Sequence, residues 1–220
     1  MFWALIMNQL FCIEKNFLVL CFLKMIIPVF PLNGAILFPS TNLPLNIFES
    51  RYINMVDYAL SKNRIIGMVQ TKETKELFNI GCLGKITNFS ETTDKTYQIN
   101  LEGTNRFKII KIIKNDHKFI TVEAAEIDDD NFKKEKPKFV EKLLTSFKRY
   151  LNVKKININT KEFENLDSIN LAKIICVISP LDYLTKQMLL EFNNTDELCT
   201  NLLSVLEIEI NNTEQNFRIN

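Results

Sequence analysis

The 220-residue sequence has few of the residues on which enzyme chemistry usually depends. Its one histidine, His117, falls in a predicted hairpin turn at 115–118, where a side chain is ordinarily exposed to solvent. The sequence contains no G-x-x-x-x-G-K-[ST] phosphate-binding loop and no G-x-G-x-x-G, G-x-S-x-G or H-E-x-x-H motif. The spacing of acidic residues along a chain does not show which of them could form an acid–base pair. We therefore expect a protein that is not an enzyme and that needs no cofactor or metal.

The sequence also lacks an excess of charge of either sign. It has 27 basic and 26 acidic residues, which gives a formal net charge of +1. Proteins that bind the phosphate backbone usually carry a clear basic excess. The composition therefore speaks against nucleic acid as a partner.

Cysteine pairs at metal-ligand spacing are missing as well. The cysteines are odd in number, far apart and never in a C-x-x-C pair, which favours free buried thiols over disulfides or metal ligands. Free thiols indicate a reducing compartment, so we expect a cytoplasmic location. The five are Cys12, Cys21, Cys82, Cys176 and Cys199.

Long hydrophobic runs are absent too, even in the apolar first 24 residues. The longest clean run there is Phe17 to Leu23, whereas a bilayer-spanning helix needs roughly 20 apolar residues. No small-residue cleavage site follows, so we expect neither a signal peptide nor stable membrane insertion. Two interpretations of residues 1–24 remain open: a misplaced start, with translation beginning at Met25, or a short packing extension. We favour the misplaced start.

From Met25 the chain divides into two parts. Residues 25–127 have the alternation and turn residues of strands, whereas residues 128–220 have helical periodicity, and the acidic run Asp128 to Asp130 is read as a connector. In the first part the spacing predicts one helix, Phe48 to Ser61. Turns are predicted at Asp94-Lys95, Gly103-Thr104 and Asn115-Asp116. The strands are expected at 26–30, 35–38, 43–47, 65–70, 81–89, 96–102, 107–113 and 119–127. This pattern predicts an α+β protein whose short strands form a small closed or half-closed barrel.

The second part predicts a helical bundle. Apolar stripes at helical spacing run over 139–151, 171–178, 181–192 and 198–206. Asn194 and Glu197 have the spacing of a capping box for the last of these helices. The stripe Leu181, Leu184, Met188 and Phe192 is expected to pack within the bundle.

Four phrases in a fixed order carry a family resemblance. They are PVFPLNGAILFPSTNLPLNIFESRY at 28–52, IGCLGKI at 80–86, LEGTNRF at 101–107 and SPLDYLTKQMLLE at 179–191. Together they resemble the N-terminal substrate-recognition domain of Lon-type ATP-dependent proteases, in particular its stand-alone bacterial form, over roughly 25–210. The chain departs from that family in its N-terminal extension and in having Asp94-Lys95 where a glycine-containing turn is usual.

The resemblance implies a PUA-like pseudo-barrel followed by a helical bundle. It also implies a non-catalytic module that binds exposed apolar polypeptide segments or a protein partner, with a protease or a chaperone as candidate partners. The sequence lacks the ATPase phosphate loop and the Ser/Lys protease domain of a full Lon protease. Two alternatives stay open: RNA binding, which PUA-like barrels can perform, and an uncharacterised hydrolase.

The candidate site residues are aromatic and charged. The 17 phenylalanines and six methionines offer adaptable apolar surface, although most must be core. The candidates for polypeptide contact are Phe38, Phe48, Tyr52 and Phe89. A second group is predicted to pair at the junction of the first helix and the barrel, because a buried charge in an apolar phrase is costly unless it is paired. This group is Glu49, Arg51 and Arg106, and plain surface exposure is the alternative for each.

Overall fold

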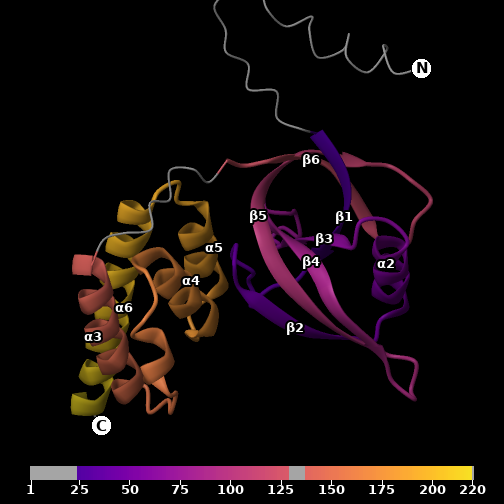
Figure 1. Cartoon of the computed structure of the whole chain (residues 1–220). Coiled ribbons are helices and arrows are strands. Elements are labelled where there is room, and N and C mark those ends of the chain that lie inside the picture. Colours follow the sequence, from indigo (N-terminus) through magenta and orange to yellow (C-terminus); the bar gives the residue numbers. More distant parts are fainter. Residues whose placement is uncertain (1–23, 129–136, 220) are drawn as a thin grey trace, which may run out of the picture.

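The structure is a computed structural model that describes residues 24–128 and 137–219. A strand-rich half comes first in the chain, and a helical half lies beside it (Figure 1). The elements are β1 (Lys24–Pro31), β2 (Asn42–Ile47), α2 (Ser50–Leu60), β3 (Ile65–Val69), β4 (Ile80–Glu91), β5 (Tyr97–Ile113), β6 (Ile120–Glu126), α3 (Pro137–Val153), the 3-10 helix η1 (Thr160–Phe163), α4 (Ser168–Ile178), α5 (Tyr183–Glu191) and α6 (Thr195–Ile219). The predicted fold class, a barrel with one packed helix followed by a bundle, is confirmed. The predictions about residues 1–23, including Cys12 and Cys21, lie outside the described residues.

The six strands form one sheet that closes on itself. Their order is β2-β5-β4-β3-β1-β6, and β5 also pairs with β6, so five strands complete a ring and β2 lies outside it against β5. The β1–β3 pair is parallel and the other pairs are antiparallel. Along β5 the side chains of Ile99 and Leu101 are buried while Gln98 and Glu102 are exposed, as expected for a strand with one face on a core.

The predicted turn at Gly103-Thr104 is wrong, because β5 runs unbroken over 17 residues. Its first half lies between β2 and β4, and its second half pairs with β6. Gly103 is required for space: a Cβ atom there would lie 2.0 Å from the carbonyl oxygen of Phe38. A close backbone approach needs glycine as much as a turn does, so sequence alone confuses the two.

The irregular segment 32–41 between β1 and β2 is the element that approaches Gly103. The predicted strand at 35–38 is irregular, and the chain just after it is hydrogen-bonded to β5 instead. Ser40 N donates to Gly103 O and Gly103 N donates to Thr41 O, both at 2.8 Å. The Thr41 hydroxyl also accepts a hydrogen bond from Phe38 N at 3.1 Å, which closes the turn.

This arrangement sends adjacent side chains into different cores. Leu37 packs with the barrel and α2, whereas Ile36 and Phe38 pack with the buried residues of the helical bundle. All three side chains are at most 4% exposed. The irregular segment therefore connects the two halves through its side chains, which explains why it is apolar although it is not a strand.

Helix α2 covers one side of the barrel. Its buried face consists of Tyr52, Met55, Val56 and Ala59, in agreement with the predicted stripe. The helix begins at Ser50 and not at Phe48, because Glu49 keeps an extended backbone as the N-cap residue.

The helices α3 to α6 form the predicted bundle around a single core. Its largest fully buried side chains include Leu143, Phe147, Tyr150 and Leu171. The predicted cap of the last helix is present, since Asn194 Oδ1 accepts a hydrogen bond from Glu197 N at 2.9 Å. Among the described cysteines, Cys82, Cys176 and Cys199 are buried thiols that form no disulfide, as predicted.

Candidate functional site

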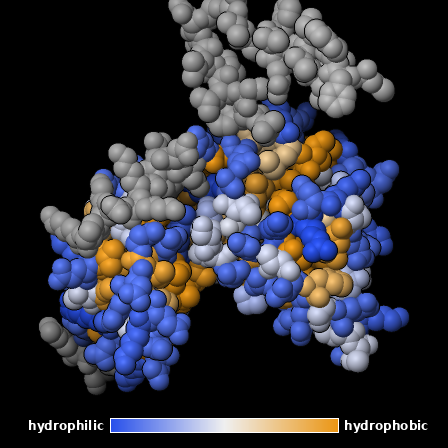
Figure 2. Space-filling view, viewed as in Figure 1, coloured by the Kyte–Doolittle hydropathy of each residue, from blue (hydrophilic) through white to orange (hydrophobic). Residues whose placement is uncertain are grey.

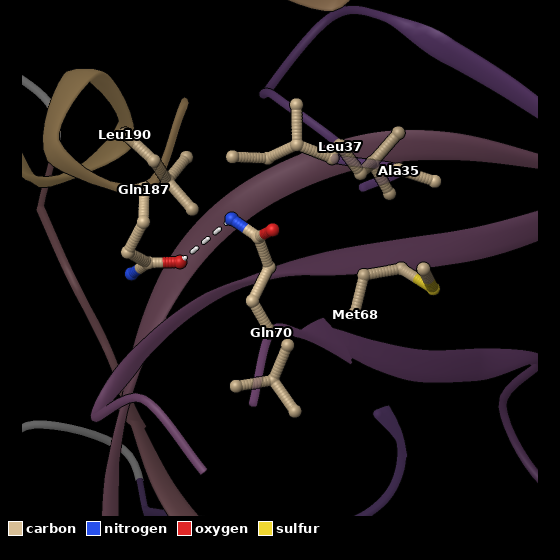
Figure 3. Close-up of a pocket in the computed structure, with 8 residues that line it drawn as sticks. Ala35, Leu37, Met68, Gln70, Gln187 and Leu190 are labelled. Carbon is tan, nitrogen blue, oxygen red and sulfur yellow. Dashed lines mark hydrogen bonds between the residues drawn. The ribbon is translucent and has the colours of Figure 1, made fainter. Parts of the chain in front are cut away.

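The joint between barrel and bundle is built around two glutamines. Gln70 follows β3 and Gln187 lies on α5, and each is 2% exposed. Gln70 Nε2 donates to Gln187 Oε1 at 3.2 Å, as Figure 3 shows, and to the carbonyl oxygen of Tyr183 at 3.0 Å. Gln187 Nε2 in turn donates to the carbonyl oxygen of Ile80 at 3.0 Å and to Glu191 at 2.7 Å. These bonds fix α5 against the ends of β3 and β4.

A second polar contact holds the other end of α5. Arg106, on β5, is 2% exposed, and its Nη1 atom donates to the carbonyl oxygens of Leu190 at 2.9 Å and Phe192 at 2.7 Å. Its Nη2 atom lies 3.4 Å from Asn193 Oδ1. A cation at the C-terminal end of a helix meets free carbonyl groups and the negative end of the helix dipole, so the guanidinium stabilises this end of α5.

A small cavity lies on the inner side of Gln187. It measures about 10 Å³ and its lining includes Ile36, Leu37, Met68 and Leu190 as well as the two glutamines. Gln70 Oε1 accepts no hydrogen bond from the described residues and is buried. The volume is close to that of a single water molecule, so this cavity is too small for a ligand.

A larger hollow lies on the outer side of Gln187. It measures about 340 Å³. Its apolar lining is Phe78, Leu184, Met188 and Phe192, and its polar lining is Gln187 and Glu191. Leu184 is 49% exposed and Met188 is 42% exposed, which is high for such side chains at the joint of two packed halves. Figure 2 shows hydrophobic residues gathered on the helical lobe beside the notch between the lobes.

The hollow exists because α5 turns a different face inward from the one predicted. The stripe Leu181, Leu184, Met188 and Phe192 was expected in the bundle core. Leu181 is buried there and Phe192 packs against it, as predicted. The prediction is wrong for Leu184 and Met188, which are exposed, while the buried residues of α5 are Lys186, Gln187, Leu189 and Leu190. The pair Leu189-Leu190 gives α5 a second apolar face, and it is the sequence signal that could have indicated the buried side.

The four aromatic candidates do not line the hollow. Phe38 belongs to the bundle core, and Tyr52 is 8% exposed with its ring 4.3 Å from that of Phe30. Phe48 and Phe89 are exposed, at 71% and 43%, and Phe89 packs edge-on against Tyr97. Polypeptide contact therefore stays a prediction for Phe48 and Phe89, whereas the burial of Phe38 and Tyr52 gives them a packing role.

The structure does not bring the three charged candidates together. Glu49 and Arg51 form an ion pair of 2.8 Å at the exposed start of α2. Arg106 is buried, as one interpretation required, but its Nη1 atom is hydrogen-bonded to the end of α5 and not to the first helix. This corrects the predicted location: a buried cation can be balanced by backbone carbonyls, which no sequence pattern marks.

Two further side chains of reactive types, Lys186 and Cys176, are buried in the helical half. Lys186 is buried with its Nζ atom 3.1 Å from the carbonyl oxygen of Val177, and burial lowers its pKa. Burial raises the pKa of the neighbouring Cys176, whose side chain is fully buried, so it stays a thiol that substrate cannot reach.

In the part of the chain that the structure describes, no three His, Cys, Asp or Glu side chains are grouped to hold a metal. His117 is exposed and stacks on Phe119 at 4.8 Å.

The fold is that of Lon N-terminal domains. The Lon N-terminal domain protein from Xanthomonas campestris matches with a TM-score of 0.65 and 20% identity, over 82% of this chain and 98% of that one. The N-terminal domain of the Lon protease from the Mycobacterium avium complex matches with a TM-score of 0.62 and 17% identity, over 85% and 98%.

Residues 26–207 match the family described as the ATP-dependent protease La (LON) substrate-binding domain, and the chain belongs to this family. Lon protease from Buchnera aphidicola subsp. Baizongia pistaciae is 28% identical over 196 residues. Lon protease from Escherichia coli K12 is 26% identical over 199 residues. Each match covers 84% of this chain and 25% of the relative, so the chain spans about a quarter of the length of the curated relatives it matches. The matched part is the substrate-binding region and not the catalytic part. The family resemblance of the four phrases is thereby confirmed.

The sequence predicted no stable membrane insertion, and the helices that the structure describes bear on this prediction. Within 24–128 and 137–219, none is both long and apolar enough to cross a bilayer.

Proposed function

We propose that the chain binds exposed apolar segments of unfolded polypeptides, and that the hollow beside α5 is where an apolar side chain of such a segment is held. The observation that carries the proposal is the exposure of Leu184 and Met188 next to Phe78 and Phe192, at a joint where neighbouring groups are buried. Membership of a substrate-binding family supports it.

The shape of the hollow sets the expected affinity. A volume of about 340 Å³ is at the low end of ligand pockets, so it holds only a few side chains, and the rest of a flexible segment must be ordered at an entropic cost. We therefore expect dissociation constants in the range of about micromolar to millimolar. Because the lining is mainly apolar, the affinity should change little with salt, unlike that of a protein that releases counterions from a phosphate backbone.

The relatives that share this domain are proteases, and the matched part of them is the region that binds substrate. We propose that a segment held by this chain is passed to a protein partner, with a protease or a chaperone as the candidate classes. RNA binding is the alternative, and a steep fall in affinity for single-stranded RNA as the salt concentration rises would indicate it.

The test compares two changes of similar chemistry on different surfaces. Leu184→Asp with Met188→Asp places charge in the hollow, and Ile208→Asp places it on α6, where Ile208 is 58% exposed and lies outside the hollow. Binding of a fluorescently labelled, permanently unfolded protein, reduced and carboxymethylated lactalbumin, would be measured by anisotropy at low and moderate salt.

We expect the hollow variant to bind at least about tenfold more weakly, equivalent to about 1.4 kcal/mol, and the control to bind like the wild type. Equal binding by all three proteins would contradict the proposed site. Absence of binding by the wild type would contradict the proposed function.

A further inference from the structure

The closed sheet leaves two strand edges without a partner among the described residues. One is the outer edge of β2, which pairs only with β5. The other is on β5, on the side that does not pair with β6. There the pairing with β4 ends at Lys108, whereas the pairing with β6 continues to Ile113. The last contact on that side is a hydrogen bond of 2.8 Å from Ile109 N to the carbonyl oxygen of Asn79. Past this bond the chain of β4 turns away toward Phe78, so Ile110 to Ile113 border no described strand there.

The edge of β2 carries features that discourage pairing. Pro44 lies in its centre and has no N–H to donate, and the exposed side chains of Asn42 and Asn46 stand on either side of it. Prolines and polar side chains are common protections of edge strands.

The edge of β5 has no such protection by proline. Ile110 is 44% exposed and Ile112 is 60% exposed, and both are β-branched residues suited to an extended neighbour. A register shift lies between Ile109 and Lys111 in the pairing with β6. Bulges of this kind are frequent at sheet edges and often occur beside functional sites.

The charges along this edge are basic. Lys108 and Lys114 are exposed and form no ion pair with other described residues. Lys111 and Lys24 both bind Glu123, at 3.0 and 3.4 Å, on the side of β5 that pairs with β6, so this group adds one net positive charge beside the edge and not on it. An incoming segment that carries carboxylates would therefore be favoured over one that carries lysines.

We propose that the edge of β5 at 110–113 binds an extended polypeptide segment by strand addition, and that the segment has alternating apolar and acidic side chains. This inference rests on the proposed function and specifies the conformation and charge of the bound segment. In strand addition the affinity comes from main-chain hydrogen bonds and the selectivity from alternate side chains.

The edge and the hollow meet at Phe78. Its ring lines the hollow, and it packs in the same cluster as Ile109, the residue whose N–H ends the pairing with Asn79. A segment added to β5 therefore begins next to the hollow. One bound chain can use both surfaces, with a side chain in the hollow and its backbone on β5.

The experiment uses one synthetic peptide that alternates valine and glutamate, and two N-methylated forms of it. In one form the main-chain nitrogens of the central residues are methylated, so that these residues cannot donate main-chain hydrogen bonds to β5. In the control form the same number of methyl groups is placed at the peptide ends. Binding to the full chain would be measured by calorimetry, and amide exchange would be followed at 109–114 and at 184–192.

Strand addition predicts that central methylation weakens binding at least tenfold while terminal methylation does not, and that the unmethylated peptide slows exchange at 110–113. A protein variant provides a second reading. Ile110→Lys with Ile112→Lys should weaken binding although it adds charge that attracts the peptide, whereas Ile208→Lys should not.

Three results are informative. If central methylation does not change the peptide affinity and the peptide slows amide exchange only at 184–192, strand addition is wrong and the proposed function still holds. A peptide with lysine in place of glutamate that binds equally well would overturn the acidic preference. No binding of any peptide or of the unfolded protein used above would overturn both the function and this inference.

Discussion

Arg106 Nη1, on the longest strand of the barrel, donates a 2.7 Å hydrogen bond to the carbonyl oxygen of Phe192 at the end of α5. The two residues are 86 positions apart in the chain. This bond joins a buried side chain of one half to the main chain of the other. It lies directly behind the surface that we propose for polypeptide binding.

Removal of the guanidinium should destabilise the whole protein. In Arg106→Met the carbonyl oxygens of Leu190 and Phe192 lose a buried donor. We expect a loss of about 3 kcal/mol in the free energy of unfolding, measured by urea denaturation. The matched control is Arg51→Met, whose ion pair with Glu49 is exposed, and it should cost less than about 0.5 kcal/mol. Equal midpoints for Arg106→Met and the wild type would show that the contact contributes nothing.

A methyl group at Gly103 should be tolerated badly. In Gly103→Ala the new Cβ would lie 2.0 Å from the carbonyl oxygen of Phe38, so the segment that reaches into the bundle must move. We expect destabilisation of more than about 3 kcal/mol, or failure to fold. Gly34→Ala is the control, because Gly34 has a φ of 85° but no atom within 4 Å, and it should cost only about 1 kcal/mol. Thermal melts of both variants decide the matter, and similar midpoints would refute the packing explanation.

The two glutamines should be energetically coupled. Gln187→Leu removes one of the two acceptors of Gln70 Nε2, which keeps its bond to the Tyr183 carbonyl, and it removes the donor to the Ile80 carbonyl. We expect a cost of about 1–3 kcal/mol. In the double variant with Gln70→Leu the costs should not add, with an interaction energy of about 1 kcal/mol. Strict additivity in a double-mutant cycle would indicate that the bond between them carries no free energy.

The start of α5 should make stability depend on pH. Asp182 caps this helix by accepting hydrogen bonds from Leu184 N and Thr185 N, each at 3.0 Å. Hydrogen bonds from Thr185, through its side chain and then its main chain, lower the pKa of the Asp182 carboxyl. A carboxyl whose pKa is lower in the folded protein stabilises the fold above its unfolded pKa, and the effect is lost as the pH falls through the folded pKa.

Asp182→Ala should therefore cost about 1 kcal/mol at neutral pH, the usual value of an N-cap. The difference from the wild type should narrow as the pH falls below about 4, near the ordinary pKa of aspartate. Urea denaturation at a series of pH values measures it. A difference that stays constant over this range would show that the charge of Asp182 does not matter.

Local patterns along the chain were enough to predict most of the fold. Alternation along β5 and the helical stripes on α2 and α3 follow from residues a few positions apart, so the barrel, the covering helix and the bundle were predicted correctly. The failures have a common origin. Gly103 leaves room for the carbonyl group of Phe38, Arg106 is bonded to α5, and the inner face of α5 contacts Gln70. Each depends on a segment far away in the chain, and periodicity carries no information about such a partner.

The candidate site was predicted less well for the same reason. The apolar stripe of Leu184 and Met188 was visible in the sequence, but its exposure depends on how α5 is rotated against the barrel. Phe38 was chosen for its hydrophobicity and proved to be core, because the segment that carries it is fixed to β5. A hydrophobic residue can be part of the core or part of a binding surface, and only the packing of the folded chain distinguishes the two.

Ile36 and Phe38 come from the strand-rich half of the chain, yet they complete the core of the helices. A helical fragment that begins at α3 would expose the apolar surface that these two side chains cover. If the chain were divided between β6 and α3, the two pieces should accordingly stay associated, and heating should melt them in one transition. The two halves are separate along the chain, but they share one core through Ile36 and Phe38.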